Sequence, residues 1–228
     1  MEAIILAGGL GTRLREVVKD LPKPMAPING KPFLYYIFKW LKQYPVRKII
    51  ISAGYKSESI IEYFGRSFMD IPIGYAIEEK PLGTGGGIRF ALLETTGKDI
   101  LVINGDTYFP VDIQSFFNKH FATSGKISIA LKKMNNFSRY GTVKCNNDDI
   151  VRFNEKKFCS EGLINGGIYI INRDFIESRN LPVSFSFEEE VLEKEAGSML
   201  LKCMVFNNEF IDIGIPEDYN RAASLLKI

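Results

Sequence analysis

Short apolar runs alternate with longer amphipathic stretches over roughly the first half of the chain. The apolar runs predict strands at Ala3 to Leu6, Lys48 to Ser52, Gly74 to Ile77, Ile100 to Ile103 and Ile127 to Leu131. The amphipathic stretches predict helices at Phe33 to Gln43, Ser57 to Phe64, Gly86 to Glu94 and Ile113 to Phe121. Because parallel strands need long crossover connections, this alternation predicts an α/β fold. We expect a mixed, mostly parallel central sheet with helices on both faces.

The pattern changes after Met134. Shorter strands are predicted at Gly141 to Cys145, Ile150 to Asn154 and Gly167 to Ile171. A capping-box match at residues 186–189 begins a predicted helix that runs through about residue 195. Pro216 is placed as the first residue of a C-terminal helix that runs through Leu226. With no repeat or linker in view, residues 1–228 are predicted to form a single domain.

Composition narrows the classes of partner. The 228 residues are 46% hydrophobic, enough to bury one substantial core. The 29 Lys and Arg are interspersed with 27 Asp and Glu, so neither nucleic acid nor an anionic membrane is an expected partner. No apolar stretch approaches the ~20 residues of a membrane span, and no signal peptide is visible, so a cytoplasmic location is expected. Cys145, Cys159 and Cys203 lack metal-binding spacing and are expected to be reduced structural thiols.

The loop that follows the first predicted strand combines flexible backbone with fixed positive charge. Glycines at 8, 9 and 11 let the chain turn sharply and bring N–H groups against a phosphate or base. Arg13 and Lys23 supply the charge. A dinucleotide-binding fingerprint does not fit, since Leu14 stands where its third glycine belongs, and the G-x-x-x-x-G-K-[ST] phosphate loop is absent. The loop therefore indicates a nucleoside triphosphate site of another kind.

Several motifs resemble those of a known family. LAGGLGTRL followed by the Pro22-Lys23-Pro24 tripeptide is similar to the signature of sugar-1-phosphate nucleotidyltransferases. Further family-like motifs are EKPLGTGGGI, VINGD, YGTV, FNEK, NGGIYI and FIDIGIPEDY. The resemblance implies a three-layer, Rossmann-like (glycosyltransferase-A-like) fold with one catalytic domain over residues 1–228. Within the family, the chain is most similar to members that transfer GMP to D-glycero-α-D-manno-heptose 1-phosphate, with those that use mannose 1-phosphate close behind.

The resemblance also implies that Asp106 and Asp212 jointly hold Mg²⁺ between the nucleotide and sugar phosphates. The residues agree, because Asp106 closely follows a buried-strand run and should lie at a strand's carboxyl end, where α/β proteins build sites. Magnesium binds through one or two carboxylates plus phosphates and needs no complete protein cage. His120 cannot form a transition-metal site alone, and on its predicted helix it reads as a partly buried histidine.

Glu79 stands in EEKPLGTGGG, which resembles the base-recognition segment of the family. Guanine presents two adjacent donors, and one ionised carboxylate can accept from both, so Glu79 favours GTP. The alternative is a charged, solvent-facing strand residue. The glycine run at 85–87 is richer than the usual family segment and suggests either a looser base loop or a backbone contact.

The remaining assignments are implied by the resemblance. Nucleotide-binding residues are expected at Leu6, Ala7, Gly8, Gly9, Gly11, Thr12, Arg13, Lys23, Glu79, Gly83, Thr84 and Asp106. Residues that bind the sugar phosphate are expected at Asn104, Tyr140, Gly141, Glu155, Lys156, Asn165 and Gly166. Of the catalytic residues Arg13, Lys23, Asp106 and Asp212, Arg13 would bind the leaving pyrophosphate and Lys23 the α-phosphate. Lys156 would hold the sugar phosphate, although an isolated Glu-Lys pair is usually solvated surface.

The predicted activity is therefore transfer of GMP from GTP to a sugar 1-phosphate, with Mg²⁺ as cofactor. The sequence leaves open a mannose, glucose or other sugar 1-phosphate and a different nucleotide. An inactive regulator that binds sugar nucleotides is a remote alternative, since such a protein is expected to lose at least one catalytic cation or metal ligand. The oligomeric state is not fixed by the sequence, and a homodimer is one alternative.

Overall fold

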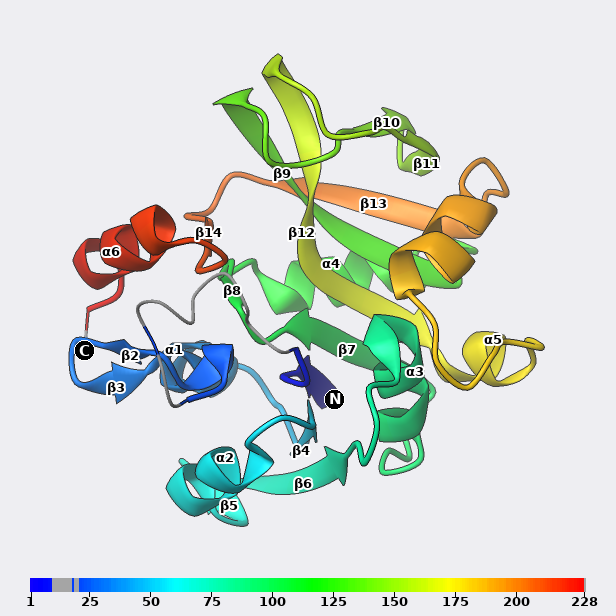
Figure 1. The fold of residues 1–228 in the computed structure, drawn as a ribbon. Helices are drawn as coiled ribbons and strands as arrows, with labels where there is room; N and C mark the ends of the chain where they lie inside the picture. The colour runs from blue at the N-terminus through cyan, green and yellow to red at the C-terminus, as the bar shows by residue number, and fades with distance from the viewer. Residues whose placement is uncertain (10–17, 19–20, 228) are drawn as a thin grey trace.

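A ten-stranded sheet runs through the computed structural model, which describes residues 1–9, 18 and 21–227 (Figure 1). In spatial order the strands are β10 (Val143–Asn146), β11 (Asp149–Phe153), β13 (Leu201–Phe206), β9 (Ile127–Phe137), β12 (Cys159–Asn172), β7 (Asp99–Asn104), β1 (Glu2–Leu6), β4 (Lys48–Ala53), β6 (Ile71–Ile77) and β5 (Ser67–Phe68).

The sheet has a parallel half and a mixed half. Strands β7, β1, β4 and β6 are parallel neighbours, with Ile4 of β1 opposite Ile50 and Val102. In the other half β12 is antiparallel to both β7 and β9, while β13 is parallel to β9. The predicted α/β fold with a mixed sheet is confirmed, and the parallel half is the part that the βα alternation predicted.

Two apolar layers cover the faces of the sheet. Successive strand residues point to opposite faces, so Ile5 joins one core cluster and Ile4 the other. Residues of α1 (Phe33–Leu41), α2 (Ser57–Phe64), α4 (Ile113–Phe121) and α6 (Pro216–Leu225) belong to the Ile5 cluster. Residues of α3 (Gly83–Leu92), α5 (Arg173–Glu177) and the π-helical η3 (Glu188–Glu193) belong to the Ile4 cluster. Each fully buried isoleucine contributes about 1.5–3 kcal/mol, so these layers fix the positions of the strand ends.

The observed elements differ from the predicted ones mainly where pairing is long-range. Helices α2 and α4 have the predicted bounds, whereas α3 begins at Gly83 rather than Gly86. Strand β12 is 14 residues long and pairs with β9 far beyond the apolar run that predicted it. Strand β13 and helix α5 were not predicted from the sequence. Among the described helices, none is both long and apolar enough to cross a membrane.

The C-terminal helix returns to the N-terminal part of the chain. Asn29, in the turn between β2 (Pro27–Ile28) and β3 (Lys31–Pro32), donates from Nδ2 to the carbonyls of Ala223 and Leu226, at 2.8 and 2.7 Å. The Tyr219 hydroxyl donates to the Pro27 carbonyl at 2.6 Å. Figure 1 shows the chain leading from α6 to a C-terminal end beside β2 and β3. Segments from both ends of the chain therefore share one side of the molecule.

Candidate active site

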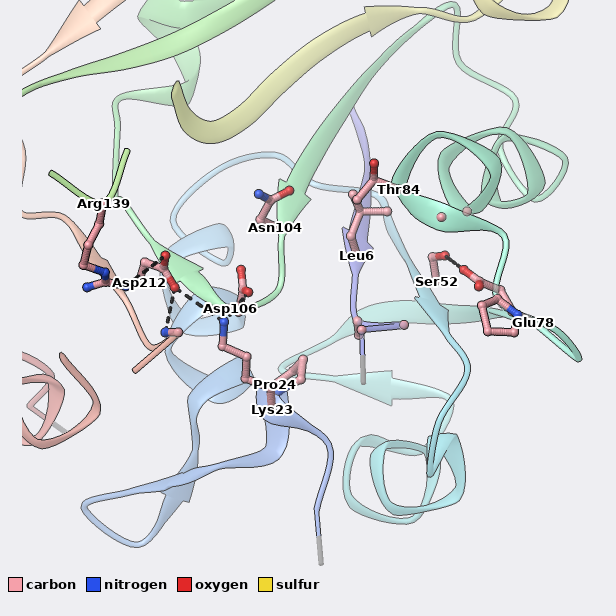
Figure 2. A pocket seen from close by; sticks show the side chains of 17 residues that line it. Leu6, Lys23, Pro24, Ser52, Glu78, Thr84, Asn104, Asp106, Arg139 and Asp212 are labelled. Atoms are coloured by element: carbon pink, nitrogen blue, oxygen red, sulfur yellow. Dashed lines mark hydrogen bonds and ion pairs between the residues drawn. The ribbon is translucent and has the colours of Figure 1, made fainter. Parts of the chain in front are cut away.

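A cavity of about 580 Å³ opens beyond the carboxyl ends of the parallel strands (Figure 2). Its volume is within the range of small-molecule sites, and its position is where open α/β sheets bind ligands. It is lined by Leu6, Ala7, Gly8, Gly9, Lys23, Pro24, Ser52, Glu78, Pro81, Gly83, Thr84, Gly87, Asn104, Asp106, Arg139, Asp212 and Gly214.

Two aspartates far apart in the sequence meet at one end of this cavity. Asp106 follows β7, and Asp212 ends β14 (Ile211–Asp212), which pairs with β8 (Thr107–Tyr108) so that Asp212 is opposite Thr107. Gly105 donates its N–H to the Leu6 carbonyl at 2.8 Å, and a Cβ at this glycine would be 2.6 Å from the same oxygen. Only glycine allows this close approach, so the turn that carries Asp106 is fixed against the end of β1.

Lys23 lies between the two carboxylates. Its Nζ is 2.5 Å from Asp106 Oδ2 and 3.5 Å from Asp212 Oδ1. A 3₁₀ turn, η2 (Lys23–Met25), places the lysine, with a proline on either side in the sequence. Burial raises the pKa of Asp212, as does the charge of Asp106, while the Lys23 and Arg139 cations oppose this shift. Lys23 therefore offsets part of the repulsion between two carboxylates that lie close together at this end.

This pair of carboxylates fits a divalent cation that is completed by phosphate. No cluster of three or more His, Cys, Asp or Glu ligands occurs in the part of the chain that the structure describes. A complete protein cage is unnecessary for magnesium, which keeps waters and takes one or two carboxylates plus substrate phosphates. The single charge of the Lys23 ammonium offsets only part of the two negative charges, so this end can still take up a divalent cation. Asp106 and Asp212 thus fit the metal-ligand role predicted for them.

The other end of the cavity is built around Glu78, not Glu79. Glu78 Oε1 accepts a hydrogen bond from the Ser52 hydroxyl at 3.3 Å, and Oε2 accepts from the Leu82 N–H at 3.0 Å. The Glu79 side chain is exposed and does not line the cavity. The cavity therefore favours Glu78 over the predicted Glu79 as the carboxylate that faces a bound base. Residues two apart share a face of a strand, so Glu78, just past the end of β6 (Ile71–Ile77), continues the face of Ala76 toward α3.

The glycine-rich start of α3 is tightly packed. Gly85 and Gly86 donate their N–H groups to the Phe185 carbonyl, at 3.0 and 3.4 Å. A Cβ at Gly85 would overlap the Phe185 ring. Thr84 lines the cavity, and its hydroxyl donates to Glu188 Oε2 at 2.7 Å and accepts from the Phe187 N–H at 2.9 Å. Of the two alternatives for this segment, the looser loop is wrong, because the glycines make room for the 183–187 segment.

The residues predicted to bind the sugar phosphate are only partly brought together. Asn104 lines the cavity, and the Tyr140 hydroxyl donates to Asp212 Oδ2 at 3.4 Å. Glu155 and Lys156 are exposed and do not line it. Asn165 has both ends of its amide engaged, since Nδ2 donates to the Tyr169 hydroxyl and Oδ1 accepts from the Gly167 N–H, each at 2.9 Å.

Both glycines of the predicted sugar-binding set are packed against protein atoms. A Cβ at Gly141 would overlap the Asn154 carbonyl, and one at Gly166 would be 2.6 Å from the Phe109 ring. Neither glycine lines the cavity. Both positions therefore need glycine because other parts of the protein approach the backbone closely there. Neither glycine faces open space in which a sugar could bind.

Most of the residues predicted to bind the nucleotide line one cavity. Eight of these predicted residues line it: Leu6, Ala7, Gly8, Gly9, Lys23, Gly83, Thr84 and Asp106. Gly11, Thr12 and Arg13 lie outside the described residues. The sequence analysis missed Ser52, Glu78 and Arg139. The cation beside Tyr140 in the Arg-Tyr-Gly tripeptide could have identified Arg139, whereas the apolar alternation of β6 at positions 71, 73, 75 and 77 favours Glu79 over Glu78.

Comparison with known proteins agrees with this geometry. The family model described as Nucleotidyl transferase matches residues 2–227. The D-glycero-alpha-D-manno-heptose 1-phosphate guanylyltransferase of Aneurinibacillus thermoaerophilus is 48% identical over 227 residues, covering 100% of this chain and 99% of the relative. The enzyme of the same name from Campylobacter jejuni is 48% identical over 220 residues, covering 96% and 97%. The crystal structure of HddC from Yersinia pseudotuberculosis complexed with GMP-PN has a TM-score of 0.89 at 38% identity and covers 99% of each chain.

Proposed function

The chain belongs to the nucleotidyl transferase family, and we propose that it transfers GMP from GTP to D-glycero-α-D-manno-heptose 1-phosphate, giving GDP-heptose and pyrophosphate. The two relatives at 48% identity are named for this activity. Their alignments with this chain cover nearly the whole length of each relative. The similar structure complexed with GMP-PN supports a guanine nucleotide in the cavity.

The observation that carries this proposal is the division of one cavity into two chemically different ends. Figure 2 shows Lys23, Asp106 and Asp212 gathered at one end and Ser52 with Glu78 at the other. The charged end suits phosphates, and the carboxylate of Glu78 suits the paired N–H donors of guanine. Leu6 and Thr84 lie between the two ends, along the path that a nucleotide would follow.

The reaction needs no protein nucleophile. An oxygen of the sugar 1-phosphate forms a bond to the α-phosphorus of GTP, and the bond from that phosphorus to the bridging α,β-oxygen breaks. Pyrophosphate leaves with the electron pair of the broken bond. Because the attacking monoester is already anionic near neutral pH, alignment and charge neutralisation should supply the catalysis.

Each charged residue has a distinct proposed role. Lys23 contacts the α-phosphate, and Asp106 with Asp212 would hold Mg²⁺, which would neutralise phosphate charge. Lys23 must then exchange its contacts with the two carboxylates for one with the nucleotide. The assignment of Arg13 to the leaving pyrophosphate and of Lys156 to the sugar phosphate remains a prediction, as do the single catalytic domain, the cytoplasmic location and the homodimer.

The test is a matrix of GTP, ATP, CTP and UTP against the 1-phosphates of D-glycero-α-D-manno-heptose, mannose and glucose, with pyrophosphate release as the readout. The highest kcat/KM is expected for GTP with the heptose 1-phosphate. A preference for mannose 1-phosphate would reassign the sugar and keep the reaction. Binding of GDP-sugars without any pyrophosphate release would favour the inactive regulator, against which the retained Lys23, Asp106 and Asp212 argue.

A further inference from the structure

We propose that Arg139 is a binding residue for the phosphate of the sugar 1-phosphate, and that Asp218 is the positioning residue that aims it. This inference rests on the proposed function, because it assigns a second cation to the acceptor end of the same cavity. Arg139 lines the cavity. Asp218, in helix α6, contacts Arg139 through its carboxylate.

The contacts of Arg139 are divided between its two terminal nitrogens. Nη1 donates to Asp218 Oδ2 in a close ion pair. Nη2 lies 3.9 Å from Asp212 Oδ2, which is an ion-pair distance but too long for a hydrogen bond. Arginine offers five N–H donors in a fixed fork that matches phosphate oxygens. One side of the fork is therefore held by Asp218, while Nη2 lies beside the cavity-lining residue Gly214 and has no hydrogen bond to a described residue.

The Arg139 guanidinium is also held by an aromatic ring on one of its faces. Its carbon lies 5.4 Å from the centre of the Tyr140 ring, and that ring packs edge-to-face on Phe210. The side chain of Asp218 is 14% exposed, so its charge is poorly solvated and strongly favours the neighbouring cation. These contacts restrict Arg139 to one arrangement before any ligand binds, which lowers the cost of ordering a long side chain on binding.

The position of Arg139 favours the acceptor over the nucleotide. Figure 2 shows Asp212 between Arg139 and Asp106, so Arg139 is on the far side of the carboxylate pair from Glu78 and Ser52. The nucleotide extends from Glu78 to Lys23, and its leaving pyrophosphate departs from the side opposite the acceptor. An anion that arrives beyond Asp212 therefore meets Arg139 first, and the Arg139 charge offsets the repulsion that the anion meets from the two carboxylates.

The experiment compares charge-removing variants with matched controls. Asp218→Asn is paired with Glu217→Gln, since both acids lie in the first turn of α6 and only Asp218 contacts Arg139. The control therefore removes a charge of the same sign from the same helix turn. Arg139→Ala is paired with Lys157→Ala, an exposed cation that does not line the cavity. Arg139→Lys tests whether the charge alone is sufficient.

The expected result is a selective loss at the acceptor. Arg139→Ala should raise the KM for heptose 1-phosphate roughly tenfold or more while the KM for GTP changes less than about twofold, as expected for the loss of charge-assisted hydrogen bonds to one substrate. Asp218→Asn should raise the same KM by about three- to tenfold, and Arg139→Lys should recover only part of the loss. Isothermal titration of heptose 1-phosphate into each variant should show the same order without turnover.

Two results would overturn the inference. One is an equal rise in both KM values, which would make Arg139 a support for the whole site. The other is an Asp218→Asn variant that melts at a lower temperature than Glu217→Gln but binds heptose 1-phosphate like the parent enzyme. Failure of the proposed function appears separately, as a parent enzyme that releases no pyrophosphate with any sugar 1-phosphate. If the parent enzyme prefers another sugar, the same ratios are measured with that sugar 1-phosphate.

Discussion

Replacing Glu78 by glutamine should reduce the preference for guanine. The Glu78 carboxylate has both oxygens at the base end of the cavity, where Oε1 also accepts from Ser52 and Oε2 from Leu82. Glutamine has nearly the same size, and its carbonyl can still accept from the Leu82 N–H. Its NH₂ group, however, presents a donor toward the two donors of guanine, so one charge-assisted hydrogen bond is lost.

The size of the effect follows from that single lost bond. Hydrogen bonds to charged groups contribute about 1.5–3 kcal/mol. At about 1.4 kcal/mol for each factor of ten, kcat/KM for GTP should fall roughly tenfold to 150-fold. UTP and dTTP should lose less or improve, because uracil and thymine present an acceptor beside their ring N–H, which an amide can satisfy.

The assay is kcat/KM for GTP, UTP and dTTP with one sugar 1-phosphate at saturation, compared as ratios so that a general disturbance of the loop cancels. Glu79→Gln is the matched control, since it removes the same charge from the next residue, whose side chain is exposed. Its ratios should stay within about twofold of the parent enzyme, as is usual for exposed substitutions. If Glu79→Gln loses guanine preference while Glu78→Gln keeps it, the assignment of the base contact to Glu78 is refuted.

Three further predictions concern other parts of the molecule. Asp106→Asn should keep the fold but lose most turnover, since an amide removes the charge that holds magnesium against phosphate; near-normal pyrophosphate release at saturating magnesium would contradict the shared metal role. Lys23→Ala should lower kcat more than it weakens GTP binding measured by calorimetry, because a charge aimed at the reacting phosphorus acts mainly in the transition state; unchanged kcat with weakened binding would instead make Lys23 a nucleotide anchor. Burial lowers the pKa of His120 although Asp99 opposes the shift, so the unfolded chain takes up a proton below about pH 6.5 that the folded chain refuses. The contribution of His120 to the free energy of unfolding should therefore be constant above pH 7 and fall as the pH drops toward 5.5. In urea titrations the parent enzyme should lose more stability over this range than His120→Gln, and an equally steep fall in His120→Gln would show that another group is responsible.

Local patterns predicted much of the parallel half of the sheet. Helices α2 and α4 have the predicted bounds because the apolar residues of each helix recur at helical spacing within its own segment. Asp106 was predicted from its place just after a buried strand, since the carboxyl ends of parallel strands meet at one edge of the sheet. The family signature added Lys23, whose proline neighbours hold it in a short turn.

Pairings between distant segments were not predictable in the same way. Strand β13 lies between β9 and β11, a neighbourhood that nothing within its own six residues specifies. The first half of β12 is polar and glycine-containing, and its extended form depends on pairing with β9. The ion pair of Arg139 with Asp218 joins residues 79 positions apart, so no local sequence pattern predicts it.

The contact between Gly85 and Phe185 limits how this cavity can diversify. Alanine at 85 would overlap the Phe185 ring, and such overpacking costs about 1–3 kcal/mol. Shortening Phe185 first would open a hole in a buried cluster, at about 3–5 kcal/mol for alanine. Either single change is harmful, while the two together can restore the packing. Lineages or directed-evolution libraries that alter the base end should therefore pass through paired substitutions at positions 85 and 185, and a screen that mutates one position at a time should miss them.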